Sequence, residues 1–453
     1  MSTFSFPRPA IIPPYKRLCN PRPLLPLSPP PPWQGPKPSL PSPSRKSLLD
    51  DSFVLSTHLI PGAYPRSTPD MPPPTLPKWS PDREVWKAST KITAEEMLVT
   101  REKYRKGELE RGTSKKLLWV CVNRYVRKGL KSDSNGVTLF FAHANGFPKE
   151  IWEPALQHLV AAGQVPGTTY TIDEIWTWEA VNHGDSALVN GENLGWAYDW
   201  QDNTRDILQF MLSYLPSSAS PSALPIHLER LPDHVSDVRK VHGFDERTMV
   251  VVGHSLGGCT TSLAALNCPR LFSSLVLIDP VIFDPSPSDF KIETQRISNT
   301  VLGTLQRRDR WPSRQDAREK FAAVPFFAAW DPAVLDMYVE SGLRDDPATG
   351  DVVLKMPSIQ EAVVFNDIST GFEVWDVLDE LDERVELRFL FPDKLPPITF
   401  QMRERLTWRR PTNSSNIIFR NAGHLIAQEI PAEMAQDLHN FLQRKYGAEL
   451  AKL

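Results

Sequence analysis

The pentapeptide Gly253-His254-Ser255-Leu256-Gly257 stands between an apolar run rich in β-branched residues, 249–252, and a stretch of small residues, 259–267. This order predicts a strand, a sharp turn and a helix. The flanking glycines, together with Gly258, permit the strained backbone that a serine needs in such a turn. The turn lifts the Ser255 hydroxyl clear of the sheet, and the next helix points its N-terminus at any oxyanion formed nearby. We therefore interpret Ser255 as a candidate nucleophile.

Composition narrows the class of protein. With 453 residues and 41% hydrophobic content, the chain can bury one large core, and we expect one large domain with an insertion. A formal net charge of -3 argues against nucleic acid or an anionic membrane surface as the main partner. The four cysteines have neither metal-ligand nor disulfide-framework spacing, which favours a reducing compartment and predicts no metal. No apolar run of roughly eighteen residues occurs, so we expect no transmembrane segment.

The two ends of the chain carry different signals. About half of the 44 prolines precede residue 82, and proline disfavours both regular helices and inner strands. We expect residues 1–51 to be a disordered, proline-rich leader. At the other end, residues 447–453 form a tail that stops at Ala451-Lys452-Leu453. This tripeptide is similar to the S-K-L address, so we expect the peroxisomal import receptor as a partner and the peroxisome as the location.

Short apolar strands separated by helical or loop material recur along the chain. The segments 116–125 and Val137–Ala142 are expected to form the antiparallel opening of a sheet, and a helix is expected over 93–110. Further strands are predicted at 170–178, 249–252, 275–278, 385–391 and 417–419. This alternation indicates an α/β fold whose mostly parallel sheet is covered by helices on both faces.

The stretch 285–384 is too long for a single crossover helix. Helical patterns rich in Phe, Trp, Leu and Val occur at 295–307, 314–323, 332–340 and 359–365. We interpret 285–384 as a helical cap inserted between two parts of the core, 52–284 and 385–446. A cap of this kind excludes water and lines an apolar pocket, so it influences which substrate is bound.

A serine nucleophile needs a base, and His424 is the best placed histidine. It lies in Asn421-Ala422-Gly423-His424-Leu425, between the last predicted strand and a terminal helix at 432–446. A loop at the carboxyl edge of the sheet can reach the serine turn. Imidazole has the pKa suited to accept the serine proton, so we expect His424 to be the general base.

An oxyanion formed at the serine needs two hydrogen-bond donors. One is the backbone N–H of Leu256, which directly follows the nucleophile. The second is expected from the loop His143-Ala144-Asn145-Gly146-Phe147, which comes after the strand at Val137–Ala142. We take the N–H of Asn145 as this donor, with Gly146 allowing the tight backbone.

Two carboxylates are candidates for the acid that orients the histidine. Asp393 closes the strand at 385–391, although the usual position of the acid on that strand falls on Leu395. Asp279 closes the strand at 275–278, where some hydrolases place the acid, but it could instead cap the next helix. We favour Asp279 slightly and keep Asp393 as the alternative. The acid would fix the histidine tautomer and stabilise the imidazolium.

These motifs occur in an order and spacing that resemble the α/β-hydrolase superfamily over residues 52–446. The loop at 179–186, Glu-Ala-Val-Asn-His-Gly-Asp-Ser, is similar to the Asp-x-Arg-Gly-x-Gly-x-Ser loop of these proteins, and we expect a structural role for its His183 and Asp185. The stretch 141–150, followed by Trp152-Glu153-Pro154, is similar to the fungal branch that includes the yeast peroxisomal lipase and the hydrolases of host-selective toxin biosynthesis. The resemblance places the cap between the sixth and seventh core strands.

The resemblance and the motifs together imply a peroxisomal serine hydrolase. It would cleave a lipid-like ester or acyl thioester through an acyl-enzyme, in lipid or secondary metabolism, with no metal or organic cofactor. An acyltransferase or a C–C bond hydrolase with the same three residues is the alternative among enzymes. A catalytically inactive binding protein of the same fold is the alternative from another class.

Overall fold

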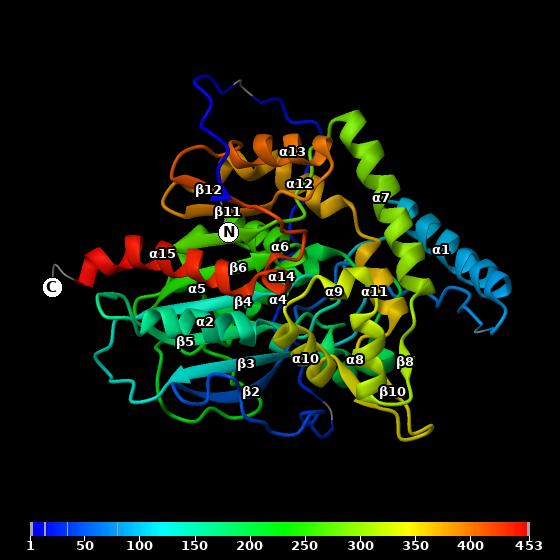
Figure 1. The fold of residues 1–453 in the computed structure, drawn as a ribbon, viewed down its shortest axis with the longest axis horizontal. Coiled ribbons are helices and arrows are strands. Elements are labelled where there is room, and N and C mark those ends of the chain that lie inside the picture. Colours follow the sequence, from blue (N-terminus) through cyan, green and yellow to red (C-terminus); the bar gives the residue numbers. More distant parts are fainter. Residues whose placement is uncertain (1–2, 13–14, 34, 79, 451–453) are drawn as a thin grey trace.

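A nine-stranded sheet in the order β1-β12-β11-β7-β6-β4-β5-β3-β2 forms the centre of the protein (Figure 1). The structure is a computed structural model that describes residues 3–12, 15–33, 35–78 and 80–450. The sheet strands are β1 (Thr3–Phe4), β2 (Phe53–Pro61), β3 (Trp119–Arg127), β4 (Val137–Ala142), β5 (Ile172–Trp178), β6 (Thr248–His254), β7 (Ser274–Ile278), β11 (Glu386–Pro392) and β12 (Ser414–Phe419). A small second sheet contains β8 (Arg310–Trp311), β9 (Leu343–Asp345) and β10 (Val352–Leu354).

Helices cover both faces of the large sheet (Figure 1). The core α-helices are α2 (Glu153–Gly163), α3 (Gly184–Asn190), α4 (Trp200–Ser213), α5 (Asp233–His242), α6 (Leu256–Asn267), α13 (Pro397–Thr407), α14 (Ile426–Glu429) and α15 (Pro431–Leu450). The others are α1 (Arg83–Arg105), α7 (Pro287–Gln306), α8 (Arg314–Ala322), α9 (Pro325–Ala328), α10 (Pro332–Ser341), α11 (Ser358–Phe365) and α12 (Ser369–Val377). The short 3-10 helices are η1 (Lys149–Trp152), η2 (Gly191–Asn193), η3 (Pro269–Leu271) and η4 (Leu378–Glu380).

Alternation along β4 explains the two helical layers. Leu139 and Phe141 belong to the apolar cluster that includes residues of α2 and α15, which pack against each other. Phe140 and Ala142 belong to the cluster on the other side, with residues of α4 and α6. Side chains of a strand point alternately to opposite faces, so a strand covered on both faces must be apolar throughout. The α/β fold with helices on both faces is therefore as predicted.

The antiparallel edge differs from the prediction. Strands β4, β6, β7, β11 and β12 are parallel to their neighbours within this group. β3 does not pair with β4, because β5 lies between them and pairs with both. The partner that the sequence did not reveal is β2, which pairs antiparallel with β3 over its full length. Its polar centre, Ser56-Thr57-His58, interrupts the apolar pattern that would have identified it.

The segment between β7 and β11 holds helices α7 to α12 and the small sheet. Helix α7 packs against α1 and α11, whereas α12 packs against α6 of the core. These helices lie at one end of the sheet, on the right of Figure 1 for α7 to α11. The division at 285–384 stays our interpretation of where the cap begins and ends.

The leader differs from the expectation of disorder over residues 1–51. In its described part, β1 pairs antiparallel with β12, and Phe6 is buried among core aromatic residues. Proline holds a chain extended without needing backbone partners, so a proline-rich segment can follow a surface wherever side chains hold it. The composition alone did not reveal those side chains.

Arg22 attaches the leader to two buried carboxylates. Its guanidinium donates to Asp199 at 2.7 Å and to Glu373 at 2.5 Å, and both carboxylates are buried. Arg205 holds the following residues of the leader by donating to the carbonyl oxygen of Leu25 at 2.9 Å. A buried carboxylate needs a charged partner, and the leader supplies such a partner to both Asp199 and Glu373.

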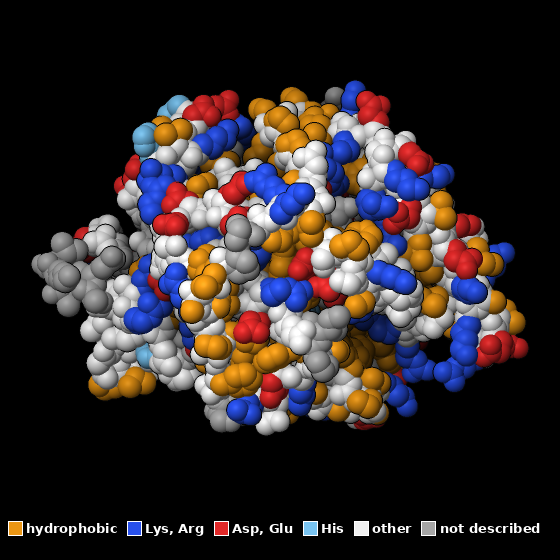
Figure 2. Space-filling model, turned by 90° about the horizontal axis from the view of Figure 1, so that it is seen from above, with side chains coloured by type: hydrophobic (Ala, Val, Ile, Leu, Met, Phe, Trp, Pro, Cys, Tyr) orange, Lys and Arg blue, Asp and Glu red, His pale blue; other side chains and the backbone are white. Residues whose placement is uncertain are grey.

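Surface charge and helix composition indicate whether the protein could bind a polyanion or cross a membrane. On the face shown in Figure 2, basic and acidic side chains are interspersed and no extended basic patch stands out. Within the described ranges, no helix combines the length and the apolar content that a bilayer crossing requires.

Candidate active site

Ser255 occupies a strained turn between β6 and α6. Its backbone angles are φ 54° and ψ -111°, a left-handed conformation that costs free energy for a residue with a side chain. The surrounding structure holds it there. Its N–H donates to the Ile278 carbonyl oxygen at 3.0 Å, and its own carbonyl oxygen accepts from the Cys259 N–H at 3.0 Å. The predicted strand, turn and helix are all present, and they place Ser255 at the end of β6, on the wall of a cavity.

The three glycines around Ser255 are needed for close approach. A Cβ atom on Gly253 would lie 2.6 Å from Thr261 Oγ1, and one on Gly258 would lie 2.8 Å from the Pro280 Cβ. A Cβ atom on Gly257 would collide with the carbonyl oxygen of Ala142 on β4. The turn can pack against β4 and the end of β7 only because these positions lack side chains.

A continuous hydrogen-bond chain joins Ser255, His424 and Asp279. His424 Nε2 lies 3.0 Å from Ser255 Oγ, and His424 Nδ1 lies 2.5 Å from Asp279 Oδ2. A carboxylate only accepts, so we assign the ring proton to Nδ1, which leaves Nε2 free to accept the serine proton. This arrangement can activate a hydroxyl as a nucleophile.

Asp279 is held in place and kept ionised. It also has a positive φ, 34°, and its N–H donates to the Leu390 carbonyl oxygen on β11 at 2.9 Å. Its other carboxylate oxygen accepts from Arg403 Nε at 2.5 Å. Burial raises the pKa of Asp279, but the Arg403 guanidinium and the bond from His424 outweigh this effect and hold that pKa well below its usual value.

Asp393, the alternative acid, lies elsewhere in the network. Its carboxylate accepts from the Asn421 N–H at 2.7 Å, and its own N–H donates to the Phe419 carbonyl oxygen at 3.1 Å. These bonds tie the end of β11 to the loop that carries His424. The structure therefore brings Asp279, and not Asp393, to the imidazole.

Two supporting side chains were missed by sequence reasoning. Arg403, buried on α13, lies 124 positions from Asp279, and nothing in its local pattern signals a partner. His254, next to the serine, donates from Nε2 to the His424 carbonyl oxygen at 2.9 Å. Burial and the nearby His424 lower the pKa of His254 to about 3, so its ring is neutral. The signal for His254 was its place inside the pentapeptide.

Both predicted oxyanion donors belong to segments next to the serine: Leu256 directly follows Ser255, and Asn145 lines the same cavity. Within the described residues, the backbone N–H groups of Leu256 and Asn145 have no hydrogen-bond acceptor. The loop of Asn145 is anchored to the turn, because the Gly257 N–H donates to the His143 carbonyl oxygen at 3.1 Å. Buried N–H groups are normally paired, so two unpaired ones beside a serine are suited to an incoming oxyanion.

The side chain of Asn145 is held from two directions. Its Oδ1 lies 2.9 Å from His183 Nε2, and its Nδ2 donates to the Glu361 carbonyl oxygen at 3.2 Å. His183 belongs to the loop at 179–186, whereas Glu361 belongs to α11 between β7 and β11. Both the core and the inserted segment thus position the candidate oxyanion loop.

The loop at 179–186 also contains a buried ionic cluster. Lys149 Nζ lies 2.8 Å from Asp185 and 3.5 Å from Glu179, and all three side chains are buried. Lys355 approaches the same Asp185 carboxylate at 2.7 Å. Asp185 therefore binds two lysines and His183 contacts Asn145, and a structural role for both residues stays our prediction.

A cavity of about 440 Å³ opens onto Ser255 and His424. Its apolar wall consists of side chains from the core and from the inserted helices: Phe147, Trp200, Val281, Ile297, Phe326, Phe327, Phe365 and Leu425. Polar and charged groups also reach it, namely Arg296, Thr300, Arg307, Tyr338, Glu361, Asp367 and Glu429. A largely apolar cavity with a few polar groups is typical of a small-molecule site.

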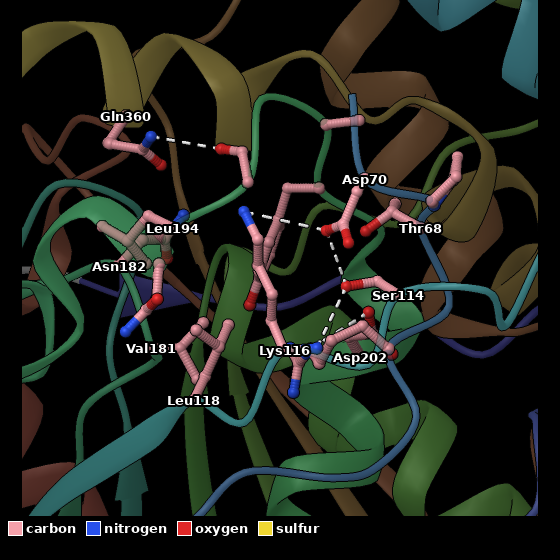
Figure 3. A pocket seen from close by; sticks show the side chains of 16 residues that line it. Thr68, Asp70, Ser114, Lys116, Leu118, Val181, Asn182, Leu194, Asp202 and Gln360 are labelled. Carbon is pink, nitrogen blue, oxygen red and sulfur yellow. Dashed lines mark hydrogen bonds and ion pairs between the residues drawn. The ribbon is translucent and has the colours of Figure 1, made fainter. Parts of the chain in front are cut away.

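A second cavity, shown in Figure 3, is not part of this site. It measures about 30 Å³ and lies between Asp70, Lys116, Asn182 and Gln360. A water molecule needs roughly 10–15 Å³ on this measure, so this space suits solvent rather than a substrate. The larger cavity at Ser255 is the candidate active site.

The sheet, the serine turn and the hydrogen-bonded histidine and aspartate define a hydrolase of the α/β type. Residues 139–437 match the alpha/beta hydrolase family, so the chain belongs to that family. It is similar to the "Peroxisomal alpha-beta-hydrolase Lpx1" of Saccharomyces cerevisiae, whose solved structure aligns with a TM-score of 0.58 at 18% identity and covers 87% of this chain and 89% of that one. This likeness supports the fold.

Proteins that are similar in sequence match smaller parts of this chain. The "Type I acyl-CoA thioesterase mpaH" of Penicillium roqueforti is 29% identical over 262 residues, which cover 57% of this chain and 52% of the relative. The "Peroxisomal membrane protein LPX1" of S. cerevisiae is 35% identical over 146 residues, covering 32% and 31%. The "Abhydrolase domain-containing protein AFT2-1" of Alternaria alternata is 36% identical over 101 residues, covering 22% and 36%. The chain thus spans about half or less of each of these relatives, which confirm the resemblance to this fungal branch.

Proposed function

We propose that this protein is a serine hydrolase that cleaves a carboxylic ester or an acyl thioester through an acyl-enzyme. The observation that carries the proposal is the hydrogen-bond chain from Ser255 through His424 to Asp279 at the wall of the cavity. The two N–H groups without acceptors beside the serine add a place for the oxyanion.

In the proposed mechanism, Ser255 Oγ attacks the carbonyl carbon while His424 Nε2 takes the hydroxyl proton. The N–H groups of Asn145 and Leu256 stabilise the negative oxygen of the tetrahedral intermediate. His424 then returns the proton to the leaving oxygen or sulfur, and the acyl-enzyme forms. A water molecule, activated by the same imidazole, releases the acid. Asp279 holds the Nδ1–H tautomer and stabilises the imidazolium, and Arg403 keeps Asp279 negatively charged.

The substrate is proposed to be a small acyl compound. The relative from P. roqueforti is named an acyl-CoA thioesterase, which supports a thioester as the first substrate to test. The apolar part of the cavity wall supports a lipid-like acyl group, because burial of apolar surface drives such binding.

A fluorophosphonate probe tests this proposal on the whole chain. We expect the probe to label the wild-type protein, with the adduct located on Ser255 by mass spectrometry of peptides. In parallel, hexanoyl-CoA and p-nitrophenyl hexanoate should be hydrolysed, and their relative kcat/KM values separate thioester from ester. A protein that is neither labelled nor active on any acyl substrate would contradict the proposal and favour an inactive binding protein. Transfer to an added alcohol or amine in preference to water would favour the acyltransferase.

We also propose that the protein works in peroxisomes. Support comes from a relative that is named a peroxisomal membrane protein and from the terminal tripeptide Ala451-Lys452-Leu453, which lies outside the described residues. A fluorescent protein joined to the N-terminus should appear in peroxisomes in fungal cells, and deletion of the tripeptide should leave it in the cytosol. Unchanged localisation after the deletion would remove the import signal from the proposal.

A further inference from the structure

An ion pair lies in the cavity wall beside the candidate oxyanion loop. Arg307, at the end of α7, donates from both terminal nitrogens to the two carboxylate oxygens of Glu361 on α11. The Glu361 carboxylate lies directly against Gly146, because a Cβ atom on Gly146 would be only 3.0 Å from Glu361 Oε1. Gly146 follows Asn145, whose N–H is the proposed oxyanion donor. The pair is therefore close to the place of the reacting carbonyl.

The pair leaves hydrogen-bond donors unused. Of the five N–H groups of Arg307, two bond to Glu361, and no other side-chain bond of Arg307 is present among the described residues. Tyr338, on the same cavity wall, is 4% exposed, and its hydroxyl has no hydrogen-bond partner in the described part of the chain. Burial raises the pKa of Tyr338 to about 12, so this hydroxyl keeps its proton and can donate.

The side chains that line the cavity differ in solvent exposure, and this difference distinguishes an enclosed end from an open end. Glu361 and Tyr338 are almost fully buried and the Arg307 side chain is 29% exposed, whereas the His424 side chain is 40% exposed and the Arg296 side chain 53% exposed. Tyr338 packs against Phe147 and Phe327, which belong to the apolar wall. The enclosed end suits the acyl group, and the exposed end, at His424, suits the departure of the leaving group.

A plain hydrocarbon chain does not match this enclosed end. It would exclude water from the free donors of Arg307 and Tyr338 without replacing the lost hydrogen bonds, which is unfavourable. An oxygen atom on the acyl chain would accept from both groups. A site built to bond a polar group discriminates strongly against the analogue that lacks it.

We propose that the site prefers acyl groups carrying an oxygen, as a hydroxyl, carbonyl or carboxylate, within a few bonds of the reacting carbonyl, and that Arg307 and Tyr338 bind this oxygen. Arg307 and Tyr338 are thus specificity-determining residues for the acyl group. The inference rests on the proposed hydrolase function and adds the class of acyl group. These acyl groups all carry an oxygen that accepts hydrogen bonds. The test below distinguishes a neutral oxygen from an anionic one.

Three CoA thioesters test the preference: hexanoyl-CoA, 3-hydroxyhexanoyl-CoA and glutaryl-CoA. The readout is the ratio of kcat/KM for each oxygenated substrate to that for hexanoyl-CoA. We expect the wild-type ratio to be roughly 10² for at least one of the two. A preference for the hydroxy compound identifies a neutral oxygen, and a preference for glutaryl-CoA identifies an anionic one.

Two variants assign the preference to the named residues. Tyr338→Phe removes a single oxygen atom, and the double variant Arg307→Met/Glu361→Gln removes the ion pair without leaving a lone buried charge. Each should reduce the ratio toward one. A purely structural role would lower kcat/KM for all three substrates together and leave the ratio unchanged, which would overturn the assignment.

The outcomes separate this inference from the function on which it rests. If the wild type hydrolyses hexanoyl-CoA and the oxygenated substrates equally well, the acyl preference is wrong and the hydrolase function stands. If it hydrolyses none of them and the fluorophosphonate probe does not label Ser255, both proposals fail.

Discussion

Replacing Ser255 with alanine should lower turnover by about 10⁶-fold, because loss of the nucleophile removes the acyl-enzyme route altogether. The hydroxyl is the atom that the imidazole of His424 faces at 3.0 Å. Alanine at this position keeps the same backbone and loses only the oxygen, so the protein should remain folded. The measurement is kcat on the best substrate of the acyl panel, with circular dichroism and Tm as checks of the fold.

Ser262→Ala is the matched control for this prediction. Ser262 lies on the same helix, α6, and is buried, but its hydroxyl donates to the Gly258 carbonyl oxygen at 2.7 Å within the helix. The Ser262→Ala variant should keep a kcat within a few-fold of the wild-type value. If Ser255→Ala kept more than a tenth of the wild-type rate, Ser255 would not be the nucleophile.

The second large effect is expected at Asp279. Asp279→Asn should reduce kcat by about 10⁴-fold, as expected when the histidine is held in the wrong tautomer. The change also leaves the buried Arg403 without a negative partner, and breaking a buried ion pair costs about 3–5 kcal/mol of stability. We therefore expect a lower Tm together with the lower kcat, and activity must be assayed well below the new Tm.

Asp393→Asn separates the two candidate acids. Its carboxylate accepts from the Asn421 N–H at 2.7 Å, and an asparagine side-chain oxygen can accept the same bond. We expect kcat within a few-fold of the wild type. The opposite pattern, a large loss in Asp393→Asn with little change in Asp279→Asn, would return the orienting role to Asp393.

Much of the fold could be predicted because its signals are local. Strand β4 occurs at the predicted residues, β6, β7 and β12 extend the predicted segments at one or both ends, and β11 is shifted by one residue from the predicted 385–391. Such strands are buried on both faces and hence apolar without interruption. Strand β2 escaped prediction because the polar residues Ser56-Thr57-His58 at its centre interrupt the apolar pattern. The order of the described part of the leader escaped prediction because composition does not show that Arg22 has buried carboxylate partners far along the chain.

The residues of the candidate site also fall into two groups, those indicated by local sequence and those identified only by tertiary contacts. The sequence alone determined the serine turn, since glycine spacing, a β-branched strand and a small-residue helix are properties of neighbouring residues, and it pointed to His424 and Asn145 through their loops. Only the tertiary structure decided between Asp279 and Asp393, because both end neighbouring parallel strands and their positions along the chain are equally suitable. What distinguishes them is the direction of one side chain toward His424 and the approach of Arg403 from α13. Such contacts join distant parts of the chain and exist only once the sheet has assembled.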